Sequence, residues 1–95
     1  MTNKQTRKKR QNGQEKVPES IYLLILHNDD VHSFDYVINA LTEVCAHKFE
    51  QAVQCALITH YKGSCDICKG PFIYIEKMKN RLLQKNLSVT ISSLS

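Results

Sequence analysis

A run of six apolar residues at positions 21–26 constrains the fold of this chain more than any other feature. The run is too short for a buried helix, and its polar boundaries are typical of a central strand that is buried on both faces. It ends abruptly at His27, and Asn28, Asp29 and Asp30 follow directly. Asn and Asp favour turns and helix caps. The sequence therefore predicts a central strand whose end presents consecutive polar side chains.

Three later segments have apolar residues spaced by three and four positions, which is typical of helices with one buried face. The first extends over about residues 33–46, and Ser33 is of the type that caps helix N-termini. The second extends over about residues 49–62 and precedes Gly63, a residue type that often ends helices. The third begins at residue 72 or 74 and ends near residue 85. The predicted buried faces contain Phe34, Val37, Ile38, Leu41, Val44 and Cys45, then Phe49, Ala52, Val53, Ala56, Leu57 and His60, then Ile75, Met78, Leu82 and Leu83.

Two further segments complete the predicted fold. Residues 64–69 form a short strand or a loop, and residues 87–91 alternate apolar with polar side chains, as a half-buried strand does. The order of elements is therefore β-α-α-β-α-β. We expect an α+β fold in which three helices pack on one side of a small, mainly antiparallel, three-stranded sheet.

The positive charge of the chain is confined to its N-terminal segment. The net charge is +4, and residues 1–19 contain six basic and two acidic residues, whereas residues 20–95 contain seven of each. With only two bulky apolar side chains, residues 1–19 cannot offset the entropy of ordering, so we expect a flexible extension before a folded domain at residues 20–95. The extension is either a basic arm that contacts nucleic acid or an acidic protein surface, or a solubilising segment without a specific partner.

The polar strand end is suited to bind an ammonium group. An ammonium has three donors and no acceptor, so its best partners are a carboxylate and neutral acceptors. Asp29 supplies the carboxylate, Asn28 an amide oxygen, and His60 near the end of the second helix a neutral imidazole. The alternative is a plain polar turn that caps the first helix, together with a hydrogen-bonded histidine in the core.

The four cysteines invite a metal or redox interpretation. Cys65 and Cys68 form a C-x-x-C pair, but zinc would need two more ligands, such as His60, His47 or another cysteine. A redox role would need a setting that stabilises the thiolate. The alternative is two small, half-buried residues, and Cys45 and Cys55 lie on helix faces as packing residues. We therefore expect neither a metal nor a cofactor. The sequence also contains no clear nucleophile with an ordered base and orienting acid, so we expect no enzyme.

Several of these segments together resemble the ClpS family of Clp protease adaptors. The resemblance rests on the apolar strand followed by Asn-Asp-Asp, on Tyr-Val-Ile at residues 36–38, on Ala52, and on His-Tyr-Lys-Gly at residues 60–63. It continues through the third helix and residues 87–91, and it covers nearly all of the predicted folded domain. Members of this family deliver N-degron substrates to a Clp ATPase–protease. The family fold agrees with the predicted order of elements.

The resemblance implies roles for individual residues. The family positions that hold the substrate's α-amino group correspond to Asn28, Asp29 and His60. The family also has a hydrophobic pocket for a large N-terminal side chain, and the corresponding positions here are His32, Phe34, Val37, Ala56, Thr59 and Leu87. The family positions that dock on the N-terminal domain of a Clp ATPase of the ClpA or ClpC type correspond to Glu76 and Arg81. The N-terminus has no apolar region of a secretory signal, and no apolar run approaches the roughly 20 residues that span a bilayer, so we expect a cytoplasmic protein without a membrane partner. The resemblance implies a monomer that acts without a cofactor or nucleic acid.

Two departures from the family pattern affect the pocket. The family has Thr-Pro-Met where this chain has His32, Ser33 and Phe34, and a Met that gates the pocket where this chain has Ala56. The preferred N-terminal side chain is therefore open. Two other functions also stay open at this stage: a nucleic-acid-binding protein that uses the basic extension, and a small zinc-binding domain that uses Cys65 and Cys68.

Overall fold

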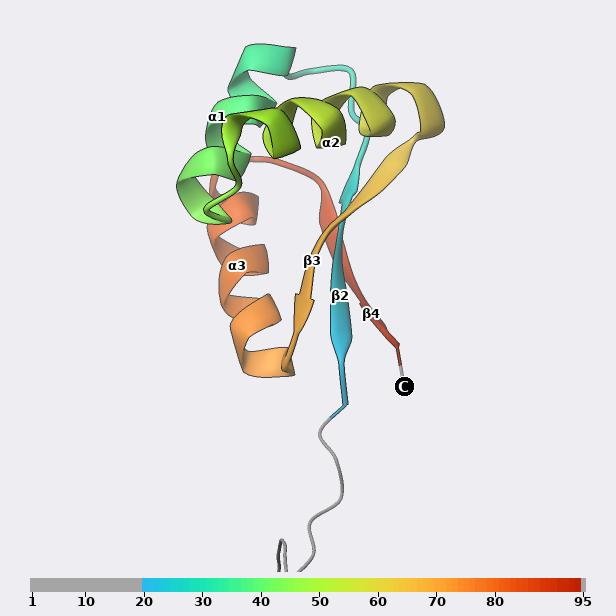
Figure 1. Cartoon of the computed structure of the whole chain (residues 1–95), viewed down its shortest axis with the longest axis vertical. Coiled ribbons are helices and arrows are strands. Elements are labelled where there is room, and N and C mark those ends of the chain that lie inside the picture. The colour runs from blue at the N-terminus through green and yellow to red at the C-terminus, as the bar shows by residue number, and fades with distance from the viewer. Residues whose placement is uncertain (1–19, 95) are drawn as a thin grey trace, which may run out of the picture.

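The computed structural model of the protein describes residues 20–94, and the predicted extension at residues 1–19 lies outside this range. The elements follow the predicted β-α-α-β-α-β order (Figure 1). They are β2 (Tyr22–His27), α1 (Phe34–Val44), α2 (Phe49–Lys62), β3 (Ser64–Gly70), α3 (Phe72–Gln84) and β4 (Val89–Ser93). The predicted α+β fold class is confirmed. None of the helices in residues 20–94 is long and apolar enough to cross a membrane.

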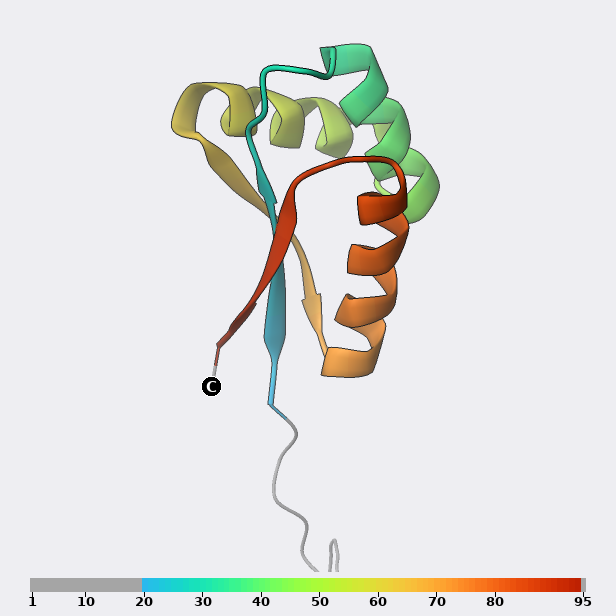
Figure 2. The same ribbon diagram turned by 180° about the vertical axis from the view of Figure 1, so that it is seen from behind.

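The three strands form one antiparallel sheet in the order β3-β2-β4, with β2 in the centre as predicted. All three helices lie on one side of this sheet, as the front and back views show (Figures 1 and 2). The core between the two layers contains Leu24 and Leu26 from β2, Leu41 from α1, and Ile75 and Leu82 from α3, all of which are almost completely buried.

The prediction that β2 is buried on both faces is wrong. Leu24 and Leu26 face the helices, whereas Leu23 and Ile25 are only half-buried. Their neighbours across the sheet include polar residues such as Lys69. A single layer of helices covers only one face of a sheet, so alternate residues of the apolar run are left at the other face.

The helix ends agree with the predicted capping residues. The Ser33 side chain accepts a hydrogen bond from the backbone N–H of Tyr36 at 3.2 Å and caps α1. Gly63 ends α2 in a left-handed conformation with φ of 93°, which favours glycine. The last strand starts later than predicted. Leu87 donates its backbone N–H to Leu82 at 3.1 Å and closes the end of α3, so β4 begins at Val89.

The predicted buried faces of the helices are wrong at several positions. The side chains of Phe34, Phe49, Leu57, His60 and Leu83 are exposed. On α2 the buried residues are all small, namely Ala52, Cys55, Ala56 and Thr59. Small side chains let α2 approach α1 and β3 closely. The buried face of α2 is therefore determined by how closely its side chains pack against these elements rather than by how hydrophobic they are.

Strand β3 contains one extra residue relative to β2. Leu24 pairs with Cys68 and Ile25 with Asp66, so Ile67 is the additional residue of a β-bulge. A strand normally turns residues three apart to opposite faces. The bulge changes this, and Cys65 and Cys68 pair with Leu26 and Leu24 on the same face of the sheet.

Candidate functional site

A cavity of about 420 Å³ lies where the chain leaves β2, between the last turn of α2 and the start of α1. All nine residues assigned to amine binding and to the hydrophobic pocket line this one cavity, namely Asn28, Asp29, His32, Phe34, Val37, Ala56, Thr59, His60 and Leu87. Four more residues that sequence reasoning did not assign complete the lining, namely Leu26, His27, Asp30 and Ser33. Positions 27 and 30 directly flank Asn28 and Asp29, and position 26 is one residue further away, so closeness in the sequence could have predicted that these residues line the cavity.

Two backbone hydrogen bonds hold the end of β2 in the cavity wall. The N–H of His27 donates to the carbonyl of Ser88 at 2.8 Å, and the N–H of Asn28 donates to the carbonyl of Gly63 at 2.9 Å. The second bond joins Asn28 to the residue that ends α2, one turn after His60. Residues far apart in the sequence are thereby fixed around one space.

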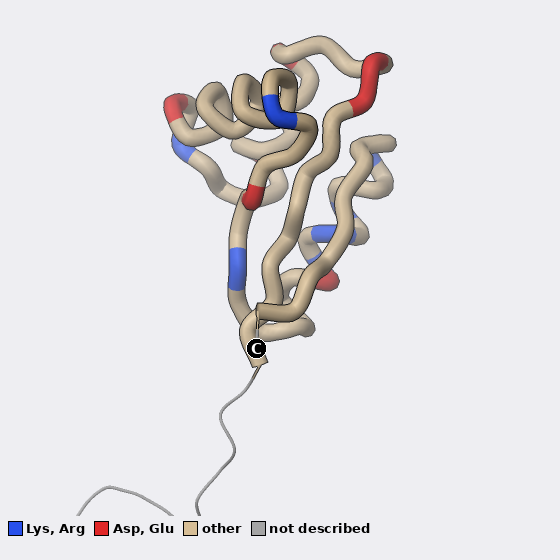
Figure 3. The backbone as a smooth tube through the Cα atoms, turned by 90° about the vertical axis from the view of Figure 1, so that its right-hand side faces the viewer, with Lys and Arg blue, Asp and Glu red and all other residues tan. Residues whose placement is uncertain are grey.

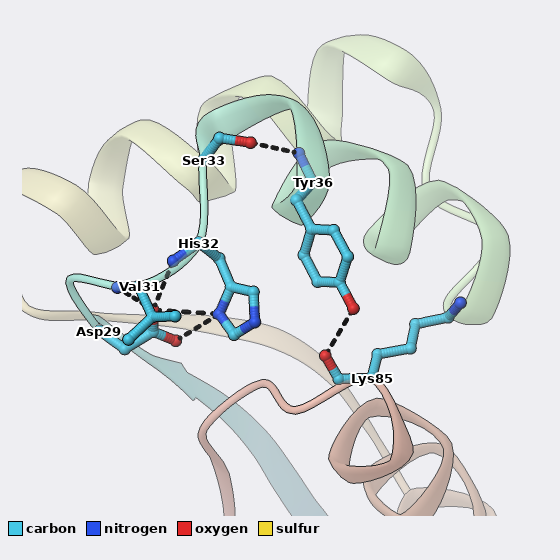
Figure 4. Close-up of polar contacts among 6 residues, drawn as sticks. All are labelled: Asp29, Val31, His32, Ser33, Tyr36 and Lys85. Atoms are coloured by element: carbon cyan, nitrogen blue, oxygen red, sulfur yellow. Dashed lines mark hydrogen bonds and ion pairs between the residues drawn. The ribbon is translucent and has the colours of Figure 1, made fainter.

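Asp29 organises the turn that follows β2 (Figure 4). Its Oδ1 accepts the backbone N–H groups of Val31 and His32 at 2.9 and 3.0 Å. The Nδ1 of His32 lies 3.1 Å from both carboxylate oxygens. Part of the polar-turn interpretation is therefore correct, because Asp29 stabilises the turn, although Ser33 rather than Asp29 caps α1.

The environment keeps Asp29 ionised. Burial alone would raise the pKa of this carboxyl, but hydrogen bonds from the His32 and Val31 backbone, a hydrogen bond from the His32 side chain and its charge outweigh burial and lower the pKa. A carboxylate offers about four lone-pair positions, and only one of the four contacts reaches Oδ2. Asp29 therefore keeps acceptor capacity for a further donor.

Aromatic side chains surround the polar end of the cavity. Phe34 meets His60 edge to face, with ring centroids 5.3 Å apart. His32 stacks on Tyr36 at 4.6 Å. The hydroxyl of Tyr36 donates to the carbonyl of Lys85 at 2.7 Å and joins α1 to the end of α3 (Figure 4). His60 itself is exposed, so the interpretation of His60 as a core histidine is wrong.

The deeper wall of the cavity is apolar. Leu26, Ala56 and Leu87 are buried there, and Val37 is half-buried. Ala56 contributes only a methyl group, so this wall leaves space that a longer side chain would fill. Thr59 is also buried, and its hydroxyl is used internally because it donates to the Cys55 carbonyl at 2.8 Å. The cavity therefore combines a polar, anionic mouth with an apolar interior.

The two predicted docking residues lie away from the cavity. Glu76 and Arg81 are exposed on α3, which also presents other basic residues along its length (Figure 3). The structure does not bring either residue to the cavity at the end of β2.

The predicted alternative of a zinc site gains no support from the geometry. Within residues 20–94, no group of three or more His, Cys, Asp or Glu side chains is arranged to hold a metal ion. The four cysteines in this range are free thiols.

Comparison with known proteins agrees with these observations. The family model described as "ATP-dependent Clp protease adaptor protein ClpS" matches residues 17–90. The ClpS adapter protein of Edwardsiella ictaluri is 44% identical over 46 residues, which are 48% of this chain and 43% of that protein. That of Serratia proteamaculans is 39% identical over 51 residues, which are 54% of this chain and 47% of that protein. The match therefore spans a little less than half the length of these curated relatives.

A solved structure has the same fold. The structure of Agrobacterium tumefaciens ClpS2 bound to L-phenylalaninamide matches with a TM-score of 0.73 and covers 80% of this chain and 99% of that chain. Its sequence identity is 21%, so the likeness concerns the fold alone.

Proposed function

Because this chain belongs to the ClpS family of ATP-dependent Clp protease adaptors, we propose that its cavity binds the N-terminus of N-degron substrates. The cavity takes both the free α-amino group and a bulky hydrophobic first side chain, and the chain delivers the bound protein to a Clp ATPase. The observation that carries this proposal is the convergence of an ionised carboxylate and an apolar wall on one space of about 420 Å³.

The amine is held at the mouth of the cavity. Asp29 accepts one ammonium N–H through its less occupied oxygen, Oδ2, and Asn28 and His60 accept the others. Charge-assisted hydrogen bonds of this kind are about twice as strong as neutral ones. An acetylated N-terminus has no positive charge and one donor, so it forms a much weaker contact.

The first side chain of the substrate enters the apolar part of the cavity. Val37, Ala56 and Leu87 contact its aliphatic or aromatic surface, and Phe34 closes one side. The related Agrobacterium ClpS2 was solved with L-phenylalaninamide, which has a free α-amino group and an aromatic side chain. In this protein, the space left by the short Ala56 supports a large first side chain in the apolar part of the cavity.

Delivery uses a different surface. Glu76 and Arg81 on the exposed side of α3 contact the N-terminal domain of a Clp ATPase of the ClpA or ClpC type. The adaptor works as a monomer in the cytoplasm and binds its substrate without catalysing a reaction. The extension at residues 1–19 acts in transferring the substrate to the ATPase.

A titration with short peptides tests the binding proposal. Peptides that begin with Leu, Phe, Tyr, Trp, Ala or Asp and are otherwise identical are compared in free and N-acetylated forms. Tight binding is expected only for free amines with a bulky first side chain. Equal binding of free and acetylated peptides would overturn the amine site, and equal binding of all first residues would overturn the pocket.

A further inference from the structure

The four cysteines form two close pairs, each of which joins a helix to β3. Cys55 on α2 and Cys65 on β3 form one pair, and Cys45 at the end of α1 and Cys68 on β3 form the other. Within each pair the thiol on β3 helps to raise the pKa of the thiol on the helix side, as a close neighbour does. The proposed peptide binding uses none of these residues.

The β-bulge at Ile67 makes this pairing possible. Without the extra residue, one cysteine of the C-x-x-C motif would point to the open face of the sheet. With it, Cys65 and Cys68 lie opposite Leu26 and Leu24, whose side chains are buried under the helices. Both thiols therefore face the layer that contains Cys45 and Cys55.

The Cys55–Cys65 pair borders a second space between α2 and β3. Both members line a cavity of about 360 Å³ there, together with His47, Gln51 and Asp66. Each pair has one buried member on the helix side and one half-buried member on β3. Neither Cys45 nor Cys68 lines this cavity, and the Cys68 thiol donates to the Met78 sulfur at 3.5 Å.

We propose that Cys55 and Cys65 are a modification site, at which a small-molecule disulfide oxidises the two thiols to a reversible disulfide that joins α2 to β3. The Cys65 thiolate attacks one sulfur of the oxidant, forms a mixed disulfide and releases one thiol. The Cys55 thiol then loses its proton and attacks the Cys65 sulfur, which releases the second thiol. Two protein thiols are oxidised and one disulfide is reduced to two thiols.

Geometry favours this bond over a bridge within the C-x-x-C motif. Cys65 and Cys68 face the same side of the sheet, and the β2 residues with which they pair, Leu26 and Leu24, are two positions apart. The Cα atoms of the two cysteines are therefore about 6.6 Å apart along the strand, near the upper limit for a disulfide, and their Cβ atoms point in parallel. Cys55 instead faces Cys65 from the opposite layer. Cys55 is buried and Cys65 is half-buried, so the oxidant reaches Cys65 first and Cys65 is the attacking group. Burial also raises the pKa of the Cys55 thiol.

Oxidation of the full chain by glutathione disulfide tests the proposal. Free thiols should fall from four to two per chain while the protein stays folded, and dithiothreitol should restore all four. After alkylation, digestion with trypsin and Asp-N separates residues 63–65 from 66–69, because cleavage precedes Asp66. The fragment 63–65 should be linked to 49–62. A bridge between Cys65 and Cys68, a link through Cys45, or a stable mixed disulfide in its place would overturn the proposal.

Two matched variants give a second test on the same strand. Cys68→Ser should still lose two thiols and form the same link, whereas Cys65→Ser should lose the 49–62 link completely. If Cys65→Ser does not fold, as judged by circular dichroism, Cys55→Ala removes the other partner and should keep its three remaining thiols free under the same oxidation. Loss of two thiols by Cys65→Ser or Cys55→Ala, or absence of the link from Cys68→Ser, would contradict the assignment.

Discussion

The substitution Asp29→Asn separates the charge of the proposed amine site from its structural role. The amide oxygen of Asn can still accept the N–H groups of Val31 and His32, which bind Oδ1 of the native residue. The amide nitrogen can donate to Nδ1 of His32 if this ring changes its tautomer. The turn after β2 should therefore persist, and folding stability should change by less than about 1 kcal/mol, since partly exposed charge pairs contribute little.

Peptide binding should respond much more strongly. The variant replaces a hydrogen bond to a charged acceptor with a neutral contact, and hydrogen bonds to charged groups contribute about 1.5–3 kcal/mol. Since 1.4 kcal/mol corresponds to a tenfold change, the affinity for a free N-terminus should fall by about 10- to 150-fold. The affinity for the N-acetylated peptide should hardly change, because that peptide has no ammonium group to lose its partner.

Fluorescence anisotropy with a labelled peptide that begins with Phe measures both affinities at about pH 8, where histidine is largely neutral. Asp30→Asn is the matched control, since Asp30 is exposed and its side chain makes no hydrogen bond with another described residue. Asp30 lines the same cavity, but the control should lose less than about fivefold, as expected for an exposed charge that makes no hydrogen bond with the ammonium. If Asp29→Asn weakens both peptides equally, or no more than Asp30→Asn does, Asp29 does not bind the amine.

Three further outcomes are expected. The lowered pKa of Asp29 means that the ionised carboxylate favours the folded state above about pH 4 and that this contribution is lost as the pH falls. Asp29→Asn should therefore reduce the acid sensitivity of folding measured by circular dichroism, and an unchanged acid transition would count against it. Gly63→Ala should destabilise the fold by about 1–2 kcal/mol in urea unfolding, because the left-handed backbone with φ of 93° is unfavourable for alanine. The added Cβ meets nothing within 4 Å, so the effect reports backbone strain rather than a clash, and an unchanged unfolding midpoint would argue against that strain. Deletion of residues 1–16 should leave peptide affinity unchanged and stop degradation of the bound substrate by the assembled Clp protease. If the truncated protein instead loses salt-dependent nucleic-acid binding while degradation is undiminished, a nucleic-acid function would be favoured.

The elements and the site were predictable because both depend on short-range patterns. The spacing of apolar residues predicted α2 with its observed bounds, and the cap at Ser33 and the end at Gly63 followed from local backbone preferences. The polar residues after β2 were predictable as a group, since a strand that ends in consecutive polar side chains must present them at the edge of the sheet. His60 lies more than thirty positions later in the sequence, and its place near the end of the second helix suggested it as an acceptor before the family resemblance supported this role.

The features that could not be predicted depend on tertiary fit. Phe49 and Leu83 are apolar and correctly spaced, yet they are exposed, because the packed faces are decided by how closely the elements approach. The bulge at Ile67 has no clear local signal, so the common orientation of Cys65 and Cys68 was hidden. The hydrogen bonds of Asp29 with His32 depend on the path of the turn rather than on the spacing of the two residues alone.

The order of the strands has a consequence for synthesis of the protein. The side chains of His27 at the end of β2 and Thr90 in β4 are hydrogen-bonded at 2.7 Å, but the two residues lie 63 positions apart in the sequence. A ribosome that adds about 5–20 residues per second would make β2 roughly 3–13 s before β4. During this interval the most apolar strand has an open edge and is prone to pair with other chains. Because Leu87 completes the cavity wall, the ability to bind a substrate should arise only as translation of this domain ends, so incomplete chains should be inactive and aggregation-prone.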